Sequence, residues 1–352
     1  MNLTVDSSLF GSALALVSSV AKTRTTLPLL HCARLATDGT TLHLTATDLD
    51  CFFSKSIPVK CDSPLTCLVP FRLAKEWLDG AGKGQLTITA DGRQTTLAIG
   101  SSKLKLFTED ASGFPAWPTG EEVEIASADL KPVHDVMLAS PESDARPELF
   151  SVPIEADGGG MVSFAGNGLF MAVRRFEGKC SSNRVIRLLP TLVTRIASLG
   201  HCSISEMDNF YVFRGADFTF LAKKLTSAGI DWRRTLNGWT FPTKVVLMRE
   251  DLLSAVASCH VLRGMERMVR VFFIQKEDGI QLSAKTATGE FTQFISTRTE
   301  GDFGQVVLPS DNILATLRSL DDEMITLEIN PLIVTKLSTA NSDYYFAAFR
   351  EK

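Results

Sequence analysis

An internal repeat of about 120 residues constrains this chain more than any other feature. Asp-Gly pairs stand between two apolar, strand-like runs at Asp38–Gly39, Asp157–Gly158 and Asp278–Gly279, and their glycines recur after 119 and 121 residues. Asp-Gly between alternating apolar runs is a strong signal for a β-hairpin, because the tight turn needs residues that tolerate positive φ. The sequence therefore predicts three copies of one unit.

A second marker has the same period. Pro70, Pro190 and Pro309 each follow a short apolar run and precede a helix-like segment. Proline is tolerated at a helix start, where its missing N–H removes no intrahelical hydrogen bond. Two unrelated markers with one period favour a true repeat. The helices predicted after these prolines are Phe71–Leu78, Thr191–Leu199 and Ser310–Leu320.

Each unit is expected to run in the order strand, helix, hairpin, helix and closing strands. This is an α+β pattern with two helices on antiparallel sheets in each of three repeated domains. Turn residues cluster near 113–118 and 238–242, which predicts domains at 1–119, 120–242 and 243–352. The first strands are Leu3–Val5, Val123–Ile125 and Lys244–Leu247; the first helices are Ser7–Val20, Ala128–Ala139 and Arg249–Val261; the closing strands are Gln85–Phe107, Cys202–Leu221 and Met324–Phe349.

The composition indicates a folded globular protein, with 45% hydrophobic and 22% charged residues. Seven cysteines without CxxC spacing are typical of reduced, buried thiols rather than a disulfide framework. Leu9–Val20 has helical spacing and no basic region before it, which favours an amphipathic helix over a signal peptide. No apolar run reaches the roughly 18 residues of a membrane span. We expect a cytoplasmic protein without membrane contact.

Candidate catalytic and metal-binding residues form weak patterns. His31–Cys32, His201–Cys202 and Cys259–His260 are adjacent pairs, and neighbours in a strand point to opposite faces. Zinc sites need wider ligand spacing, so we expect no metal and no cofactor. Asp48 and Asp50 leave open a hydrolase that uses paired carboxylates. Because no motif places a nucleophile beside a base, the sequence favours a protein that is not an enzyme.

Basic residues fall on or near equivalent helices of the repeat, although the net charge is -4. Together they would form a positive surface that binds phosphates without regard to base sequence. For any single one of them, an ordinary solvated helix face explains the charge equally well. The residues are Arg24, Arg72 and Lys75 in the first unit, Arg184, Arg187 and Arg195 in the second, and Arg263, Arg267 and Arg318 in the third.

With these residues in view, the chain resembles the beta sliding clamp of bacterial DNA polymerase III from end to end. Arg24–Leu30 is similar to the family's arginine-x-TLPIL segment, and Ala46–Asp50 to its ATDLE strand. Phe114–Pro118 matches the FPxxP that ends the first domain, and Gly229–Arg234 resembles FPDYRR in the second.

The resemblance implies a replication processivity factor. Two copies would join head to tail into a closed ring of six domains, with helices lining the hole around double-stranded DNA. DNA polymerase and an ATP-driven clamp loader would dock through short hydrophobic peptides. The alternative is a clamp-like accessory protein that does not encircle DNA.

The resemblance also assigns residues. Arg24 and Arg72 match positions that contact DNA in the family, and Arg146 is a weaker candidate. Lys75 and Arg195 are added because they lie on the second helices of the first and second units. The dimer contact would join Leu104 and Leu106 of one copy to Val261 and Leu262 of the other. The peptide pocket, between the second and third domains, would be lined by Leu149, Gly168, Leu169, Phe170, Met171, Ile230, Arg234, Thr235, Pro309, Tyr345, Ala347, Phe349 and Arg350.

The pocket segment departs from the family at two positions. Where the family has TDGHRLA, this chain has Gly166–Ala172, which puts Leu169 and Phe170 in place of histidine and arginine. The chain's end, Ala347–Arg350, also differs from the family's MPMRL. We expect an apolar groove of altered shape, and therefore an altered preference for partner peptides.

Overall fold

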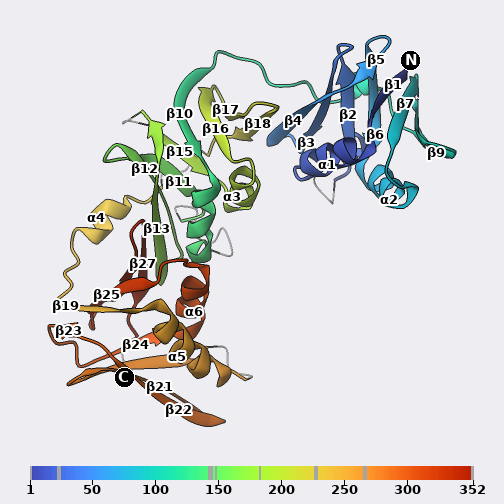
Figure 1. The fold of residues 1–352 in the computed structure, drawn as a ribbon. Helices are drawn as coiled ribbons and strands as arrows, with labels where there is room; N and C mark the ends of the chain where they lie inside the picture. The colour runs from blue at the N-terminus through green and yellow to red at the C-terminus, as the bar shows by residue number, and fades with distance from the viewer. Residues whose placement is uncertain are drawn as a thin grey trace. The chain divides into compact units, whose positions relative to one another are not determined.

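The computed structural model describes residues 2–21, 25–141, 146, 149–181, 184–225, 229–264 and 268–349. Antiparallel strands dominate and helices are few, which confirms the predicted α+β class (Figure 1). The chain forms two compact units: Met1–Ala128 with His201–Lys224, and Asp129–Gly200 with Leu225–Lys352. Among the described residues, every helix falls short of the length and apolarity needed to span a membrane.

The first unit contains two sheets and two helices that pack on each other. The helices are α1 (Ser7–Ser18) and α2 (Phe71–Ala81), and short 3₁₀ turns lie at Pro28–His31 and Ala111–Gly113. One sheet has the order β5 (Lys60–Cys61), β1 (Asn2–Asp6), β7 (Gln85–Asp91), β8 (Gln94–Ile99) and β9 (Ser102–Phe107). The other includes β10 (Val123–Asp129), β16 (His201–Met207), β17 (Phe210–Arg214), β18 (Phe218–Lys223), β4 (Cys51–Pro58), β3 (Thr41–Thr47), β2 (Cys32–Thr37) and β6 (Leu65–Pro70).

The second unit repeats this plan. The helices α5 (Arg249–Val261) and α6 (Ser310–Ser319) pack together, as do α3 (Pro190–Ala197) and the 3₁₀ helix η3 (Lys131–Ala139). One sheet includes β15 (Val185–Leu188), β11 (Val152–Asp157), β12 (Gly160–Gly166), β13 (Phe170–Phe176), β27 (Ser342–Ala347), β26 (Val334–Ser338), β25 (Met324–Asn330), β19 (Thr243–Met248) and β23 (Thr299–Glu300). The other has the order β22 (Gly289–Ser296), β21 (Gly279–Thr286), β20 (Arg270–Lys276) and β24 (Gln305–Pro309), and a short helix α4 (Trp232–Leu236) precedes β19.

Helix α1 shows how local sequence sets an element. The Asp6 carboxylate accepts hydrogen bonds from the backbone N–H groups of Ser8 and Leu9, both at 2.9 Å, and so caps the first turn. Phe10, Ala13 and Val17 are buried at helical spacing. Burial of this stripe fixes which face of α1 meets the sheet.

The repeat markers are confirmed. The three Asp-Gly pairs lie in the turns of the hairpins β2–β3, β11–β12 and β20–β21, and the three prolines stand at the starts of α2, α3 and α6. Gly39 has φ 114, a conformation that L side chains rarely adopt. The helix predicted at Ala128–Ala139 is shorter and of the 3₁₀ type, because β10 continues to Asp129.

The sheets continue across the predicted domain boundaries. Strand β18 pairs with β4, and β13 pairs with β27. Aromatic rings reinforce both contacts: Phe53 and Phe220 lie 5.4 Å apart between centroids, and Phe170 and Phe346 lie 4.9 Å apart. The middle repeat therefore contributes strands to both units, and the division at residues 119 and 242 stays a prediction.

The cysteines give the first testable prediction. None of the seven forms a disulfide in the described structure, and burial raises the pKa of the Cys67 thiol from 9.0 to about 11. Unfolded thiols ionise near pH 9 while the folded one keeps its proton. The protonated Cys67 thiol therefore contributes its full share to the free energy of unfolding below pH 9, and this contribution is lost as the pH rises towards 11.

We predict that the free energy of unfolding of the native chain falls, relative to that of Cys67→Ala, between about pH 8 and about pH 11. Urea titrations of both proteins across this range measure the difference. Subtracting the free energy of unfolding of Cys67→Ala from that of the native chain removes the contribution of lysines and tyrosines, which titrate in both proteins. A difference that stays constant with pH would contradict the prediction.

Candidate functional site

The face formed by α1 and α2 carries a groove of about 1200 Å³. Arg72 and Lys75, both predicted to contact DNA, are exposed along it. Arg72 forms an ion pair with Glu76 at 2.8 Å, and the hydrogen bond and charge of this carboxylate raise the pKa of the guanidinium. Arg24 lies outside the described residues. Lys83 is exposed along the groove as well, so the groove offers three exposed cations to a polyanion, one of them already paired.

The remaining helices carry charges of both signs. Arg195 is half-buried in the last turn of α3, and Arg318 is exposed on α6. Helix α1 has no lysine or arginine, and the first turn of α5 carries Glu250 and Asp251 after Arg249. The described helices thus carry charges of both signs, and the positive surface expected from the sequence stays a prediction.

Arg146 lies in a different place from the helical cations. Its guanidinium packs against Gly168, where an added Cβ would sit 2.9 Å from Nη1, and Gly168 has φ 93. Gly168 belongs to the turn between β12 and β13. The structure thus places Arg146 with the predicted pocket residues rather than with the DNA candidates.

The predicted pocket consists of two separate cavities in the second unit. The first, of about 30 Å³, lies between the β11–β13 sheet and the segment that leads into α4. Its walls include Leu149, Met171 and Ile230, as predicted, together with Phe164 and Trp232.

The second cavity is larger, about 280 Å³. Leu169, Pro309, Ala347 and Phe349 line it, all of them predicted wall residues. Residues 347–349 are held in place by backbone hydrogen bonds, because Ala347 N–H donates to Leu169 O at 2.9 Å and Phe349 N–H to Val307 O at 3.0 Å. This anchoring gives the cavity a fixed apolar wall.

Some predicted wall residues lie elsewhere. Phe170 is 2% exposed and stacks on Tyr344 and Phe346 in the core, because neighbours in a strand point to opposite faces and Met171 takes the cavity side. Tyr345 is buried in a cluster with Trp232 and Val173. Arg234 and Thr235 are exposed on α4 and line neither cavity, and Arg350 lies outside the described residues.

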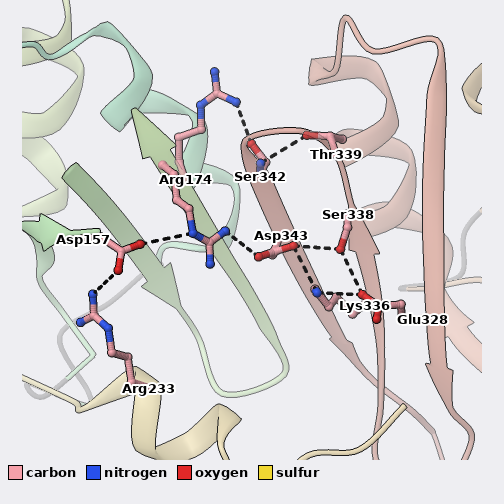
Figure 2. Close-up of polar contacts among 10 residues, drawn as sticks. Asp157, Arg174, Arg233, Glu328, Lys336, Ser338, Thr339, Ser342 and Asp343 are labelled. Carbon is pink, nitrogen blue, oxygen red and sulfur yellow. Dashed lines mark hydrogen bonds and ion pairs between the residues drawn. The ribbon is translucent and has the colours of Figure 1, made fainter. Parts of the chain in front are cut away.

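A chain of ion pairs holds α4 against the sheet (Figure 2). Trp232 Nε1 donates to Glu155 Oε1 at 2.7 Å, and Arg233 contacts both Glu155 and Asp157. Burial lowers the pKa of Arg233, but its hydrogen bonds and charge contacts with these two carboxylates outweigh burial and raise it. Because Trp232 is a cavity wall, this network fixes the shape of the first cavity.

The same network ties β13 to the third repeat. Arg175 lies 3.3 Å from Asp157 and 2.8 Å from Asp343, which in turn accepts a hydrogen bond from Ser338 (Figure 2). Lys336 pairs with Glu328 at 2.7 Å. Cations and carboxylates alternate along the network, so each of these partly exposed charges has a partner of opposite sign.

Of the predicted dimer residues, Leu104 and Leu106 lie on β9, whereas Val261 and Leu262 lie at the C-terminal end of α5, a helix that contacts β22. Strand β9 ends one sheet of the first unit, and β22 ends one sheet of the second. Leu106 is 2% exposed and Leu104 is half-buried within their own sheet, whereas Val261 is 79% exposed and Leu262 half-buried. The exposed apolar side chains on the edge strands are Phe107, at 77%, and Phe294, at 50%, and the sequence did not single out either.

Comparisons with known proteins give one consistent similarity. Residues 1–118 match the family model of the DNA polymerase III beta subunit, N-terminal domain. The chain is 22% identical to a beta sliding clamp from Synechocystis sp., over 98% of each chain. Solved structures with the same fold include the beta subunit of Streptococcus pyogenes DNA polymerase (TM-score 0.90, 15% identity) and the sliding clamp of Bacillus subtilis (TM-score 0.90, 17% identity), each matched over all of both chains. A clamp from Pseudomonas aeruginosa bound to griselimycin has TM-score 0.89 and 20% identity, again over all of both chains.

Neighbouring residues 169 and 170 provide a direct test of the cavity geometry. We predict that Phe170→Ala costs about 3–5 kcal/mol in the free energy of unfolding, because it empties a stacked core site. Leu169→Ala, at a side chain 63% exposed, should cost about 0.5 kcal/mol or less. Urea denaturation measures both changes. Equal costs would contradict the assignment of Phe170 to the core.

Proposed function

This chain is a divergent relative of the bacterial beta sliding clamps, and we propose that it works as a DNA sliding clamp. The observation that carries the proposal is the full-length likeness to beta-clamp structures, with a TM-score of 0.91 for a beta subunit from Eubacterium rectale. A clamp needs no covalent chemistry and no cofactor. It raises processivity because a tethered polymerase rebinds its template before it diffuses away. Its place of action would be the cytoplasm, where bacterial DNA replicates.

In this proposal two copies of the chain associate head to tail. The β9 edge of one copy would pair with the β22 edge of the other, and the same contact repeated would close a ring. Both strands end their sheets, and both carry an exposed phenylalanine. Pairing would satisfy backbone groups that open edges leave without a strand partner.

DNA would be held by enclosure more than by charge. In the part of the chain that the structure describes, α1 carries no lysine or arginine and Arg72 is already paired with Glu76. Each phosphate contact adds to the salt dependence of binding, so few contacts imply a weak dependence.

Partner proteins, such as a polymerase and a clamp loader, would insert a short apolar peptide into the two cavities. Leu169, Met171 and Phe349 supply apolar surface, and the anchored chain end and the α4 network keep the walls in place. Apolar pockets with a few convergent polar groups are typical of such recognition.

The mixed charge of the helices also favours a second candidate function. A clamp-like accessory protein that binds partner peptides but does not enclose DNA would have no need of a positive helix face. The two functions differ in one property, which is retention on closed DNA.

The sliding-clamp proposal predicts retention that depends on topology. Protein assembled at high concentration around a nicked circular plasmid should stay bound during gel filtration and should leave when one cut makes the plasmid linear. Raising the salt from about 50 to about 200 mM should weaken retention less than tenfold, against about 10³-fold or more for a protein making many phosphate contacts.

The control is Arg72→Gln, which should leave retention on the circle nearly unchanged. Equal retention on circular and linear DNA, or no retention on either, would overturn the proposal and favour the accessory protein.

A further inference from the structure

Arg187 occupies an unusual position at the first cavity. It lies in β15 opposite Pro153 of β11, while its neighbours Ile186 and Leu188 are buried on the other face of the sheet. This alternation turns the Arg187 side chain towards the cavity, where it lines the wall with Ile230 and Trp232. A cation therefore stands in an otherwise apolar site.

The Arg187 guanidinium has no carboxylate partner in the described part of the chain. Its Nη1 is buried and makes no hydrogen bond there. Two other arginines near the cavities are paired: Arg233 with Glu155 and Asp157, and Arg263 with Asp311 at 2.7 Å. Because a buried donor without a hydrogen bond is costly, the half-buried Arg187 remains available for an anion that is not part of this chain.

Gly229 shows that the chain makes room for this guanidinium. A Cβ added at Gly229 would clash with Nη1 and Cζ of Arg187. The backbone before α4 thus passes directly over the guanidinium, and only glycine permits that approach. The position of Arg187 is set by its surroundings and is not that of a freely solvated side chain.

The carboxylates of the adjacent strand β11 are already paired with other residues. Glu155, on the same strand as Pro153, accepts hydrogen bonds from both Trp232 and Arg233. Asp157 is shared between Arg233 and Arg175. Both acids are therefore occupied by the α4 network.

We infer that Arg187 receives an acidic side chain, aspartate or glutamate, of the partner peptide. This inference rests on the peptide-binding role proposed above and specifies the chemistry of its ligand. The first cavity, about 30 Å³, has room for the end of one side chain, whereas the second, about 280 Å³, suits the apolar residues of the same peptide. A guanidinium binds a carboxylate through two parallel hydrogen bonds. These hydrogen bonds are stronger in a site shielded from water.

Fluorescence anisotropy with designed peptides tests the inference. The probes are fluorescein-labelled decapeptides that contain two leucines and one phenylalanine, with a single glutamate moved through the other positions. Each has a twin in which glutamine replaces glutamate, so that only the charge differs. The proteins are the native chain, Arg187→Met and the control Arg234→Gln, which changes an exposed arginine that lines neither cavity.

We expect at least one register in which the glutamate peptide binds the native chain about tenfold or more tightly than its glutamine twin. The preference should vanish in Arg187→Met and persist in Arg234→Gln. Gly229→Ala, which displaces the guanidinium without removing it, should weaken the preference as well. Thermal unfolding of each variant checks that the fold is kept.

Two outcomes would overturn the inference in distinguishable ways. If peptides bind but glutamate and glutamine twins bind equally in every register, Arg187 is not a carboxylate receptor and the peptide pocket stands. Arg187 is equally excluded as the receptor if the preference survives in Arg187→Met. If no peptide binds the native chain, the pocket itself fails, while retention on circular DNA still tests the clamp function separately.

Discussion

Backbone pairing between repeats is the constraint on which the structure depends. The middle repeat gives β18 to the sheet of the first and β13 to the sheet of the third, through the pairs β18–β4 and β13–β27. Each sheet is thereby extended and its core closed by aromatic contacts such as Phe53 with Phe220. The arrangement leaves an open edge at β9 and at β22, and the proposed self-association uses those two edges.

Much of the fold could be predicted from the sequence because its signals are local. The Asp-Gly turns and the prolines need only a few neighbouring residues to act, and all six lie where the repeat placed them. Helix α5 has the predicted bounds, Arg249–Val261. The helix expected at Ala128–Ala139 failed in part because β10 extends to Asp129, an extension that depends on strand pairing and not on local sequence.

The site was less predictable because it depends on which face of a strand each side chain points to and on which charged groups pair with each other. Adjacent residues such as Phe170 and Met171 are equally apolar, and only the register of β13 decides which one reaches the cavity. The sequence marked Arg187 as one basic residue among several near a helix. Its significance comes from contacts that no local pattern contains: the glycine that passes over it and the carboxylates already bound to Arg233. The mixed charge of the helices likewise emerges only once Arg72 is seen with Glu76.

The mass of the particle in solution tests the central claim most directly. Light scattering on the native chain should give twice the 38.4 kDa of one copy, and both Phe107→Asp and Phe294→Asp should reduce it to 38.4 kDa, because each puts a charge at one of the two edges. An exposed change away from these edges, Leu169→Asp, should leave the doubled mass intact. A native chain that stays at 38.4 kDa at high concentration, or a doubled mass that survives both phenylalanine changes, would contradict the account.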